Sequence, residues 1–418
     1  MRNGTAQGRG KNAFTSGFEG PWTTSPTEWT NEYFLNLLNF DWEKHKGPGN
    51  HWQWRPKAAK SAASGKLPNI MMLTTDIALT QDPVYLDLVK KFSANLTLLT
   101  EQFGAAWYKL MTRDMGPRTR CLGDLAGPAR PWQMPLPAAP KTLPDFSKVK
   151  ADIIKAISTP NAAVPGDTVG GKRYYGALLG RLAYQCASTY RETDYAGGCN
   201  GARIRFEPMK SWPQNKGLDK ALQLLEPIKA RYKDLSWADL IVLAGTAAQE
   251  AAAGPGAPAF PFCGGRTDAA DGANTDHLAP RKYINATVAV IDNIKVSGLT
   301  PAEAVALAGQ LRSPAAQKAQ GYSSSRADSA GKLSNEFFKV LLQSDWRKVN
   351  SPSGKEEYTA NGGLFLTPSD LVIKQDPKLS AIAKEYAADN AKFLKAFAAA
   401  WTKLMNADRF KGPAGSVC

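Results

Sequence analysis

The sequence feature that most constrains the fold is an internal repeat. Three blocks near the start of the chain return in the same order near its end. The copies are offset by 304 residues at the first block and by 294 at the other two, so the second copy carries one deletion and otherwise keeps the spacing. Repetition of this kind indicates a duplicated domain. The paired blocks are residues 29–42 and 333–346, 74–83 and 368–377, and 106–111 and 400–405.

The two copies differ in the length of sequence that precedes them. The second copy follows a long patterned stretch, from about Lys172 to Lys332, whereas the first follows only 28 residues. Between the copies, residues 127–144 contain six prolines, which is typical of an irregular linker. We therefore expect one and a half domains: a partial domain over residues 1–126 and a complete one over residues 145–418.

Most long segments carry helical periodicity, which predicts a mainly α-helical fold. Residues 96–111 are an example, because Leu99, Phe103, Trp107 and Leu110 fall on one face of a helix. Side chains suited to helix N-caps mark the starts of further helices. These expected caps are Asp82, Ser236 and Thr300.

Sheet structure should be minor. The Trp-rich segment 47–54, with its glycines and proline, predicts a small hairpin between helices. Pro227 should kink or end a helix that begins near Leu218, because proline removes a hydrogen-bond donor from the helix interior.

Charge and hydropathy narrow the functional classes. Lys and Arg number 52 against 37 Asp and Glu, a formal charge of +15, but the basic residues are dispersed rather than clustered. Dispersed charge does not favour nucleic-acid binding. No apolar run of about 18 residues is present, so we expect no membrane span, and the first residues lack the apolar core of a secretory signal.

The number and spacing of the cysteines and histidines indicate the redox environment of the chain and whether it binds a metal ion. The five cysteines form an odd number without C-x-x-C spacing, which argues against a disulfide framework and a zinc site and favours an intracellular, reducing compartment. His45 and His51 flank a turn, yet no carboxylate or cysteine is suitably spaced to complete a metal site. His277 lies in a polar loop and should be solvated. We therefore predict no protein-bound metal ion.

Four motifs carry a resemblance to a known family. Residues 15–24, 26–29, 72–76 and 113–117 together resemble the catalase-peroxidases, the two-domain members of the class I haem peroxidases. This resemblance implies orthogonally packed helices of the haem-peroxidase type in both copies. It further implies that the N-terminal domain binds haem b and removes hydrogen peroxide, while the C-terminal copy binds no haem.

The resemblance also assigns roles to single residues. Trp29 is similar to the proximal tryptophan beside the haem. Asp76 is similar to the carboxylate that hydrogen-bonds the haem-ligating histidine and raises its basicity. Arg120 resembles the family's mobile arginine, although Cys121 stands where the family usually has tyrosine. Without the resemblance, these residues would be interpreted as a core tryptophan, a helix-capping aspartate and a surface arginine.

The haem-ligating parts of the family pattern have no counterpart here. None of the three histidines lies in the Gly-Gly-His-Thr setting of a proximal ligand, so we identify no axial ligand for haem. In the second copy the pattern persists with altered chemistry, because Gln185 occupies the general-base position and an amide does not accept a proton near neutral pH. The altered distal positions are Arg181, Tyr184 and Gln185, and the altered proximal positions are Leu311, Leu333 and Asp370.

Two functional hypotheses follow. The first is that the chain is part of a catalase-peroxidase and is inactive by itself. The second is a non-enzymatic structural or partner-binding module that complements a separate N-terminal half, or pairs with a second copy of itself. A basic module that binds an acidic polymer is a third alternative, which the dispersed charge disfavours.

Overall fold

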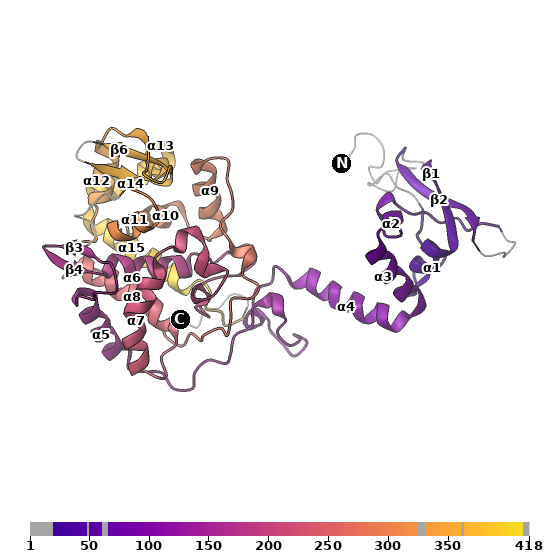
Figure 1. The fold of residues 1–418 in the computed structure, drawn as a ribbon, viewed down its shortest axis with the longest axis horizontal. Coiled ribbons are helices and arrows are strands. Elements are labelled where there is room, and N and C mark those ends of the chain that lie inside the picture. Colours follow the sequence, from indigo (N-terminus) through magenta and orange to yellow (C-terminus); the bar gives the residue numbers. More distant parts are fainter. Residues whose placement is uncertain (1–19, 48–49, 61–65, 324–330, 361–362, 413–417) are drawn as a thin grey trace. The chain divides into compact units, whose positions relative to one another are not determined.

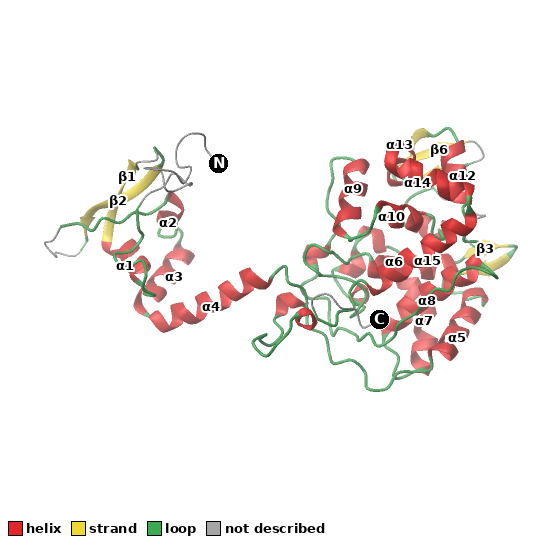
Figure 2. Cartoon of the chain, turned by 180° about the vertical axis from the view of Figure 1, so that it is seen from behind, coloured by secondary structure: helices red, strands yellow, loops and turns green. Residues whose placement is uncertain are grey.

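The computed structural model describes residues 20–47, 50–60, 66–323, 331–360, 363–412 and 418. The chain divides into two compact units, residues 1–111 and 112–418. In the part of the chain that is described, both units are mainly helical with short antiparallel strands (Figure 1; Figure 2). The predicted fold class is confirmed. The finer boundaries that we predicted, with a linker over residues 127–144, remain a proposal.

The first unit is a small helical cluster with one hairpin. Strands β1 and β2 pair antiparallel, with Lys46 opposite Trp52, which confirms the expected hairpin. Asp82 caps α3 as predicted, accepting hydrogen bonds from the backbone amides of Val84 and Tyr85. Its elements are α1 (Glu32–Asn39), β1 (Phe40–Lys46), β2 (Trp52–Ala59), α2 (Thr74–Ala78), α3 (Pro83–Ala94) and α4 (Leu96–Thr112).

The second unit holds the larger core. Its helices are α5 (Phe146–Ser158), α6 (Gly176–Ala187), α7 (Leu218–Arg231), α8 (Trp237–Ala253), α9 (Ala286–Val296), α10 (Pro301–Ala308), α11 (Pro314–Ala319), α12 (Glu336–Gln343), α13 (Pro368–Gln375), α14 (Pro377–Ala388) and α15 (Asn390–Asn406). Its strands are β3 (Asp167–Val169), β4 (Lys172–Tyr174), β5 (Arg347–Asn350), β6 (Glu356–Ala360) and β7 (Leu364–Leu366). The order α12, β5–β7, α13, α14, α15 repeats the order α1, β1–β2, α2, α3, α4.

Helix α8 is the centre of this core. Thirteen of its 17 residues are buried, and it packs against α5, α6, α7 and α15. A methyl group added at Gly245 would lie 2.2 Å from Cβ of Ala183, so the close approach of α6 and α8 requires glycine there. The indole of Trp401 on α15 is fully buried and donates a 3.0 Å hydrogen bond to Oγ1 of Thr246 on α8.

The expected helix signals in this unit have different outcomes. Ser236 and Thr300 cap α8 and α10 as predicted, each accepting a hydrogen bond from a backbone amide three residues later. Pro227 does not end its helix, since α7 continues to Arg231. The buried side chains of Leu224 and Ile228 on either side of the proline hold the helix to the core despite the lost hydrogen bond.

The cysteine expectation is wrong for four of the five residues. Cys186 forms a disulfide with Cys199, and Cys263 forms one with Cys418. Spacings of 13 and 155 residues resemble no local motif, so only the fold brings these partners together. The assignment to a reducing compartment therefore loses the observation on which it rested.

The disulfides make a direct prediction for chemical labelling. Under denaturing, non-reducing conditions, iodoacetamide should add once per chain, at Cys121, which is the free cysteine of the described residues. After reduction it should add five times, because all five cysteines are then thiols. Intact mass spectrometry measures both numbers. Five additions without reductant would contradict the two disulfides.

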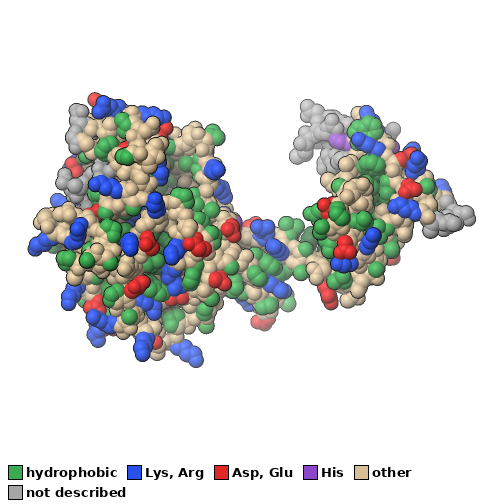
Figure 3. Space-filling model, viewed as in Figure 1, with side chains coloured by type: hydrophobic (Ala, Val, Ile, Leu, Met, Phe, Trp, Pro, Cys, Tyr) green, Lys and Arg blue, Asp and Glu red, His purple; other side chains and the backbone are tan. Residues whose placement is uncertain are grey.

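The surface view agrees with the dispersed charge of the sequence. On the face drawn, Lys and Arg of the second unit are spread over several elements, with Asp and Glu among them (Figure 3). Within the described segments, no helix has the length and apolar character needed to cross a membrane.

Candidate functional site

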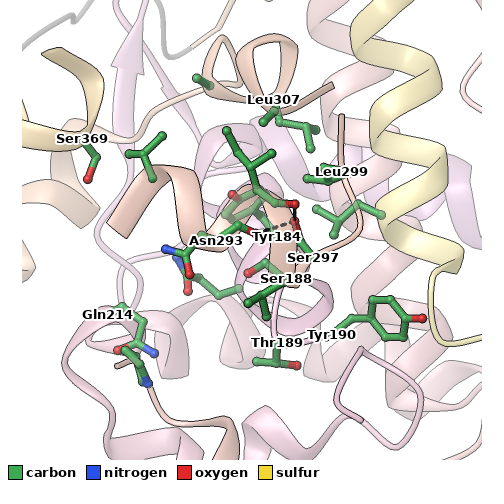
Figure 4. Close-up of a pocket in the computed structure, with 18 of the residues that line it drawn as sticks. Tyr184, Ser188, Thr189, Tyr190, Gln214, Asn293, Ser297, Leu299, Leu307 and Ser369 are labelled. Atoms are coloured by element: carbon green, nitrogen blue, oxygen red, sulfur yellow. Dashed lines mark hydrogen bonds between the residues drawn. The ribbon is translucent and has the colours of Figure 1, made fainter. Parts of the chain in front are cut away.

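The second unit contains a cavity that is lined by two of the altered distal positions and one of the altered proximal positions. Its volume is about 520 Å³, within the range of small-molecule pockets. Helix α6 contributes Tyr184 and Gln185, and α13 contributes Asp370. Hydroxyl and amide side chains from α6, α9 and the segment around Gln214 converge on the space (Figure 4).

The distal position on α6 retains a half-buried arginine, Arg181, which does not line the cavity. Arg181 donates from Nη2 to the carbonyl of Gln214, while its Nε has no partner among the described residues. Burial lowers the pKa of Arg181 to about 10. Burial also raises the pKa of Tyr184, so this phenol stays protonated near neutral pH. Together with Gln185, this side offers no group of the kind that takes a proton from peroxide.

The proximal side is closed by an ion pair that sequence reasoning missed. Arg312 donates to both carboxylate oxygens of Asp370, from Nη1 at 2.7 Å and from Nη2 at 2.5 Å. Thr367 donates to the same carboxylate from its backbone amide and its hydroxyl. Burial alone would raise the pKa of Asp370, but the Arg312 guanidinium holds it below its ordinary value. The position of Arg312, directly after Leu311, was the available signal.

The two remaining proximal positions belong to the core. Leu311 and Leu333 are buried, and neither is among the residues that line the cavity. A peroxidase haem takes a histidine ligand on this side. Leucine cannot supply it, and Asp370 is saturated by Arg312 and Thr367. The residues of this cavity therefore do not fit a histidine-ligated haem.

The described histidines do not offer another ligand position. His277 lines the cavity from a 3-10 turn, Asp276–Leu278, rather than from the segment after α10 that carries Leu311. The residue is solvent-accessible, as expected, although its ring is partly enclosed by the cavity wall. Burial first and Arg191 second lower its pKa. His45 and His51 belong to the hairpin region of the first unit. The described residues hold no cluster of three or more His, Cys, Asp or Glu suited to a metal ion.

In the first unit, Asp76 is held by groups of its own unit. Its carboxylate accepts hydrogen bonds from the Trp22 indole at 2.7 Å, the Tyr33 hydroxyl at 2.8 Å and the backbone amide of Leu73 at 2.7 Å. Burial and Asp76 together raise the pKa of Tyr33. Trp22 and Tyr33 are contacts that the sequence did not suggest.

Trp29 and Arg120 have separate surroundings. Trp29 is half-exposed, and its indole donates to Oγ1 of Thr100 on α4 at 2.8 Å rather than to Asp76. In the second unit, the guanidinium carbon of Arg120 lies 3.2 Å from the ring centre of Tyr195 and 4.9 Å from that of Phe410. These distances allow cation–π attraction. The roles suggested for Trp29, Asp76 and Arg120 remain proposals.

Equivalent residues of the two copies differ in exposure on one apolar surface. This surface consists of Phe103, Trp107 and Leu110, and we call it the α4 face. Their exposed fractions are 45, 54 and 63%, whereas the equivalent α15 residues Phe397, Trp401 and Leu404 are exposed by 0, 0 and 2%. In the second unit these side chains are covered because α15 packs against α6, α8 and α10.

Comparison with known proteins agrees with this architecture. The peroxidase family model matches residues 149–389. A catalase-peroxidase of Pseudomonas putida is 37% identical over 443 residues, covering 96% of this chain and 57% of its own length. Catalase-peroxidase 2 of Legionella pneumophila is 36% identical, covering 98% of this chain and 58% of its own.

A third relative extends the comparison. Catalase-peroxidase 1 of Haloarcula marismortui is 36% identical over 455 residues, with 98% of this chain and 60% of its own length covered. The chain thus spans about three fifths of the length of the curated relatives it matches. The family model matches more than half of this chain, and these relatives match nearly all of it. The chain therefore belongs to the peroxidase family, among the catalase-peroxidases.

Proposed function

We propose that this chain acts as part of a catalase-peroxidase, which removes hydrogen peroxide with haem b once further helices cover the α4 face. The observation that carries the proposal is the contrast between α4 and α15, whose equivalent faces are exposed and buried respectively. Exposed contiguous apolar surface is characteristic of an interaction site. In the second copy, α6, α8 and α10 cover the equivalent face of α15. We therefore expect helices equivalent to these three to cover the α4 face.

In this proposal the two units have different tasks. The first unit contributes the proximal side through Trp29 and Asp76, and Arg120 contributes the mobile arginine. Haem would supply the iron chemistry for peroxide removal when bound. The second unit would serve as a haem-free structural domain, which is supported by the engagement of Asp370 with Arg312 and by the buried leucine at position 311, since neither supplies an axial histidine.

Complementation tests the proposal. The full chain should be co-expressed with the portion of the Pseudomonas putida relative that it does not match, in the presence of haemin. We expect the two polypeptides to elute together from size exclusion, with a stoichiometric Soret band and oxygen release from peroxide. The chain alone should show neither stoichiometric haem nor turnover.

Substitutions on α4 give the matched control. The Phe103→Asp and Trp107→Asp changes place a charge in the apolar contact, so each should abolish co-elution. The Glu101→Gln change, at an exposed position of the same helix, should leave it intact. Stoichiometric haem with turnover in the chain alone would refute the requirement for further helices.

A second candidate function is that of a non-enzymatic structural partner. It is favoured by the same α4 face together with the second unit's lack of a proton acceptor at Gln185. The same co-expression separates it from the first, because co-elution without haem or oxygen release would support this alternative.

A further inference from the structure

A second cavity lies elsewhere in the second unit. Its volume is about 440 Å³, and it is bounded by the segment 113–139, the turn around residues 194–203 and residues 408–410. Apolar and aromatic side chains form much of the wall, including Trp132, Leu136 and Phe410. His277 is the lining residue that it shares with the cavity described above.

Four arginines line this cavity. Besides Arg113, three of them donate hydrogen bonds to backbone carbonyl oxygens rather than to acids. Arg118 donates to the carbonyls of Gly127 and Ala126, at 2.9 and 3.0 Å. Arg203 donates to those of Met134 and Pro135, at 3.0 and 3.3 Å. Arg409 donates to that of Gly264, at 2.9 Å. No carboxylate of the described residues lies within ion-pair distance of any of the three.

The burial of these arginines leaves donors without partners. Arg409 is only 7% exposed, yet its Nη1 has no hydrogen-bond partner among the described residues, and the same is true of Nε of Arg203. Burial lowers the pKa of both guanidinium groups. A buried cation without a partner is costly. Both nitrogens are themselves buried, so a small rotation of each guanidinium group would bring them to an anion in the cavity and satisfy donors that the protein leaves unpaired.

Acids near the cavity offset only part of this charge: Asp408 favours the charged form of Arg409, but burial still lowers the pKa of that guanidinium. Asp194 is already paired with Arg191. Asp408 accepts the backbone amide of Asn200 at 2.5 Å, and its Oδ1 has no partner. Burial raises the pKa of Asp408 although Arg266 and Arg409 act against it. With Asp408 close by, a ligand of single negative charge suits the site better than a multiply charged one.

We propose that this cavity binds a small organic carboxylate that has an apolar body. The planar carboxylate accepts hydrogen bonds from Arg409 and Arg203, since guanidinium groups match carboxylates in geometry. The apolar body packs against Trp132 and Leu136. This site is independent of peroxide chemistry and of the α4 face.

Calorimetric titration of the full chain with benzoate tests the site. Benzoate should bind saturably. Benzamide, which has the same shape without the charge, should bind at least about tenfold more weakly. Acetate, which lacks the apolar body, and inorganic phosphate should each also bind more weakly than benzoate.

Variants assign the binding to this cavity. The Arg409→Gln and Arg203→Gln changes should each weaken benzoate binding by about tenfold or more. The Arg173→Gln change is the matched control, because Arg173 also donates to a carbonyl, that of Gly166, but lies outside the cavity. Circular dichroism checks that each variant is folded, and either arginine variant suffices for the test.

The overturning results are equally specific. No saturable benzoate binding at millimolar concentration, or equal binding of benzamide, would overturn the carboxylate site. If inorganic phosphate bound as tightly as benzoate, the site would select anions in general, and the proposed preference for an organic carboxylate would be wrong. If Arg173→Gln lost as much benzoate binding as the cavity variants, the binding could not be assigned to this cavity.

Discussion

The Trp401→Ala variant is expected to lose about 3–5 kcal/mol of the free energy of unfolding of the second unit. The indole is fully buried between α15 and α8, stacks on Phe397 and donates to Oγ1 of Thr246. Its removal leaves a cavity and an unpaired hydroxyl. Urea titration followed by far-UV circular dichroism measures the loss, and hydrogen exchange in α8 and α15 locates it.

The repeat provides a matched control for this change. Trp107 occupies the equivalent position on α4, where it is more than half exposed and stacks on Phe103. The Trp107→Ala change should therefore cost less than about 1 kcal/mol. Similar losses in both variants would mean that the α4 face is buried in the free chain, against the basis of the proposed function.

The Asp370→Asn variant is the second large effect that we expect. Removing the charge leaves Arg312 in the protein interior without its bidentate partner, which should lower the free energy of unfolding by about 3–5 kcal/mol. The Glu385→Gln change breaks an exposed pair with Lys392 at 2.7 Å and should cost less than about 1 kcal/mol. Urea titrations at pH 7 compare the two.

The pH dependence of this variant follows from the lowered pKa of Asp370. A carboxyl whose folded pKa lies below its unfolded value stabilises the fold above the unfolded pKa, and this contribution is lost as pH falls through the folded pKa. The wild-type chain should therefore lose stability below about pH 4, where unfolded aspartate titrates. The difference between wild type and Asp370→Asn should shrink over the same range. A constant difference down to pH 2 would contradict the ion pair.

The fold was largely accessible from sequence because its determinants are local or repeated. The blocks that recur near residues 29 and 333 reveal the duplication, and Asp82 and Ser236 mark helix starts by hydrogen bonds that span two or three residues. The disulfide between Cys263 and Cys418 was not accessible, because its partners are 155 residues apart and meet only in the folded chain.

The candidate site was only partly accessible from sequence. Gln185 could be assigned to the distal position and Leu311 to the proximal position by family motifs, but only Gln185 lines the cavity. Arg312 could not be assigned to Asp370 in the same way, since they are 58 residues apart and the pairing depends on where α13 packs. The hydrogen bond from Trp22 to Asp76 was likewise hidden, because it joins segments without a shared motif.

The burial of α15 against α6 and α8 has a consequence for synthesis on the ribosome. Helix α15 spans residues 390–406 of a 418-residue chain, and it carries Phe397 and Trp401 into the core around α8. Helices α5 to α8 are therefore made long before the helix that completes their core. The second unit cannot reach its final packing until α15 has emerged, so the apolar helices made before it stay open to aggregation during that part of elongation.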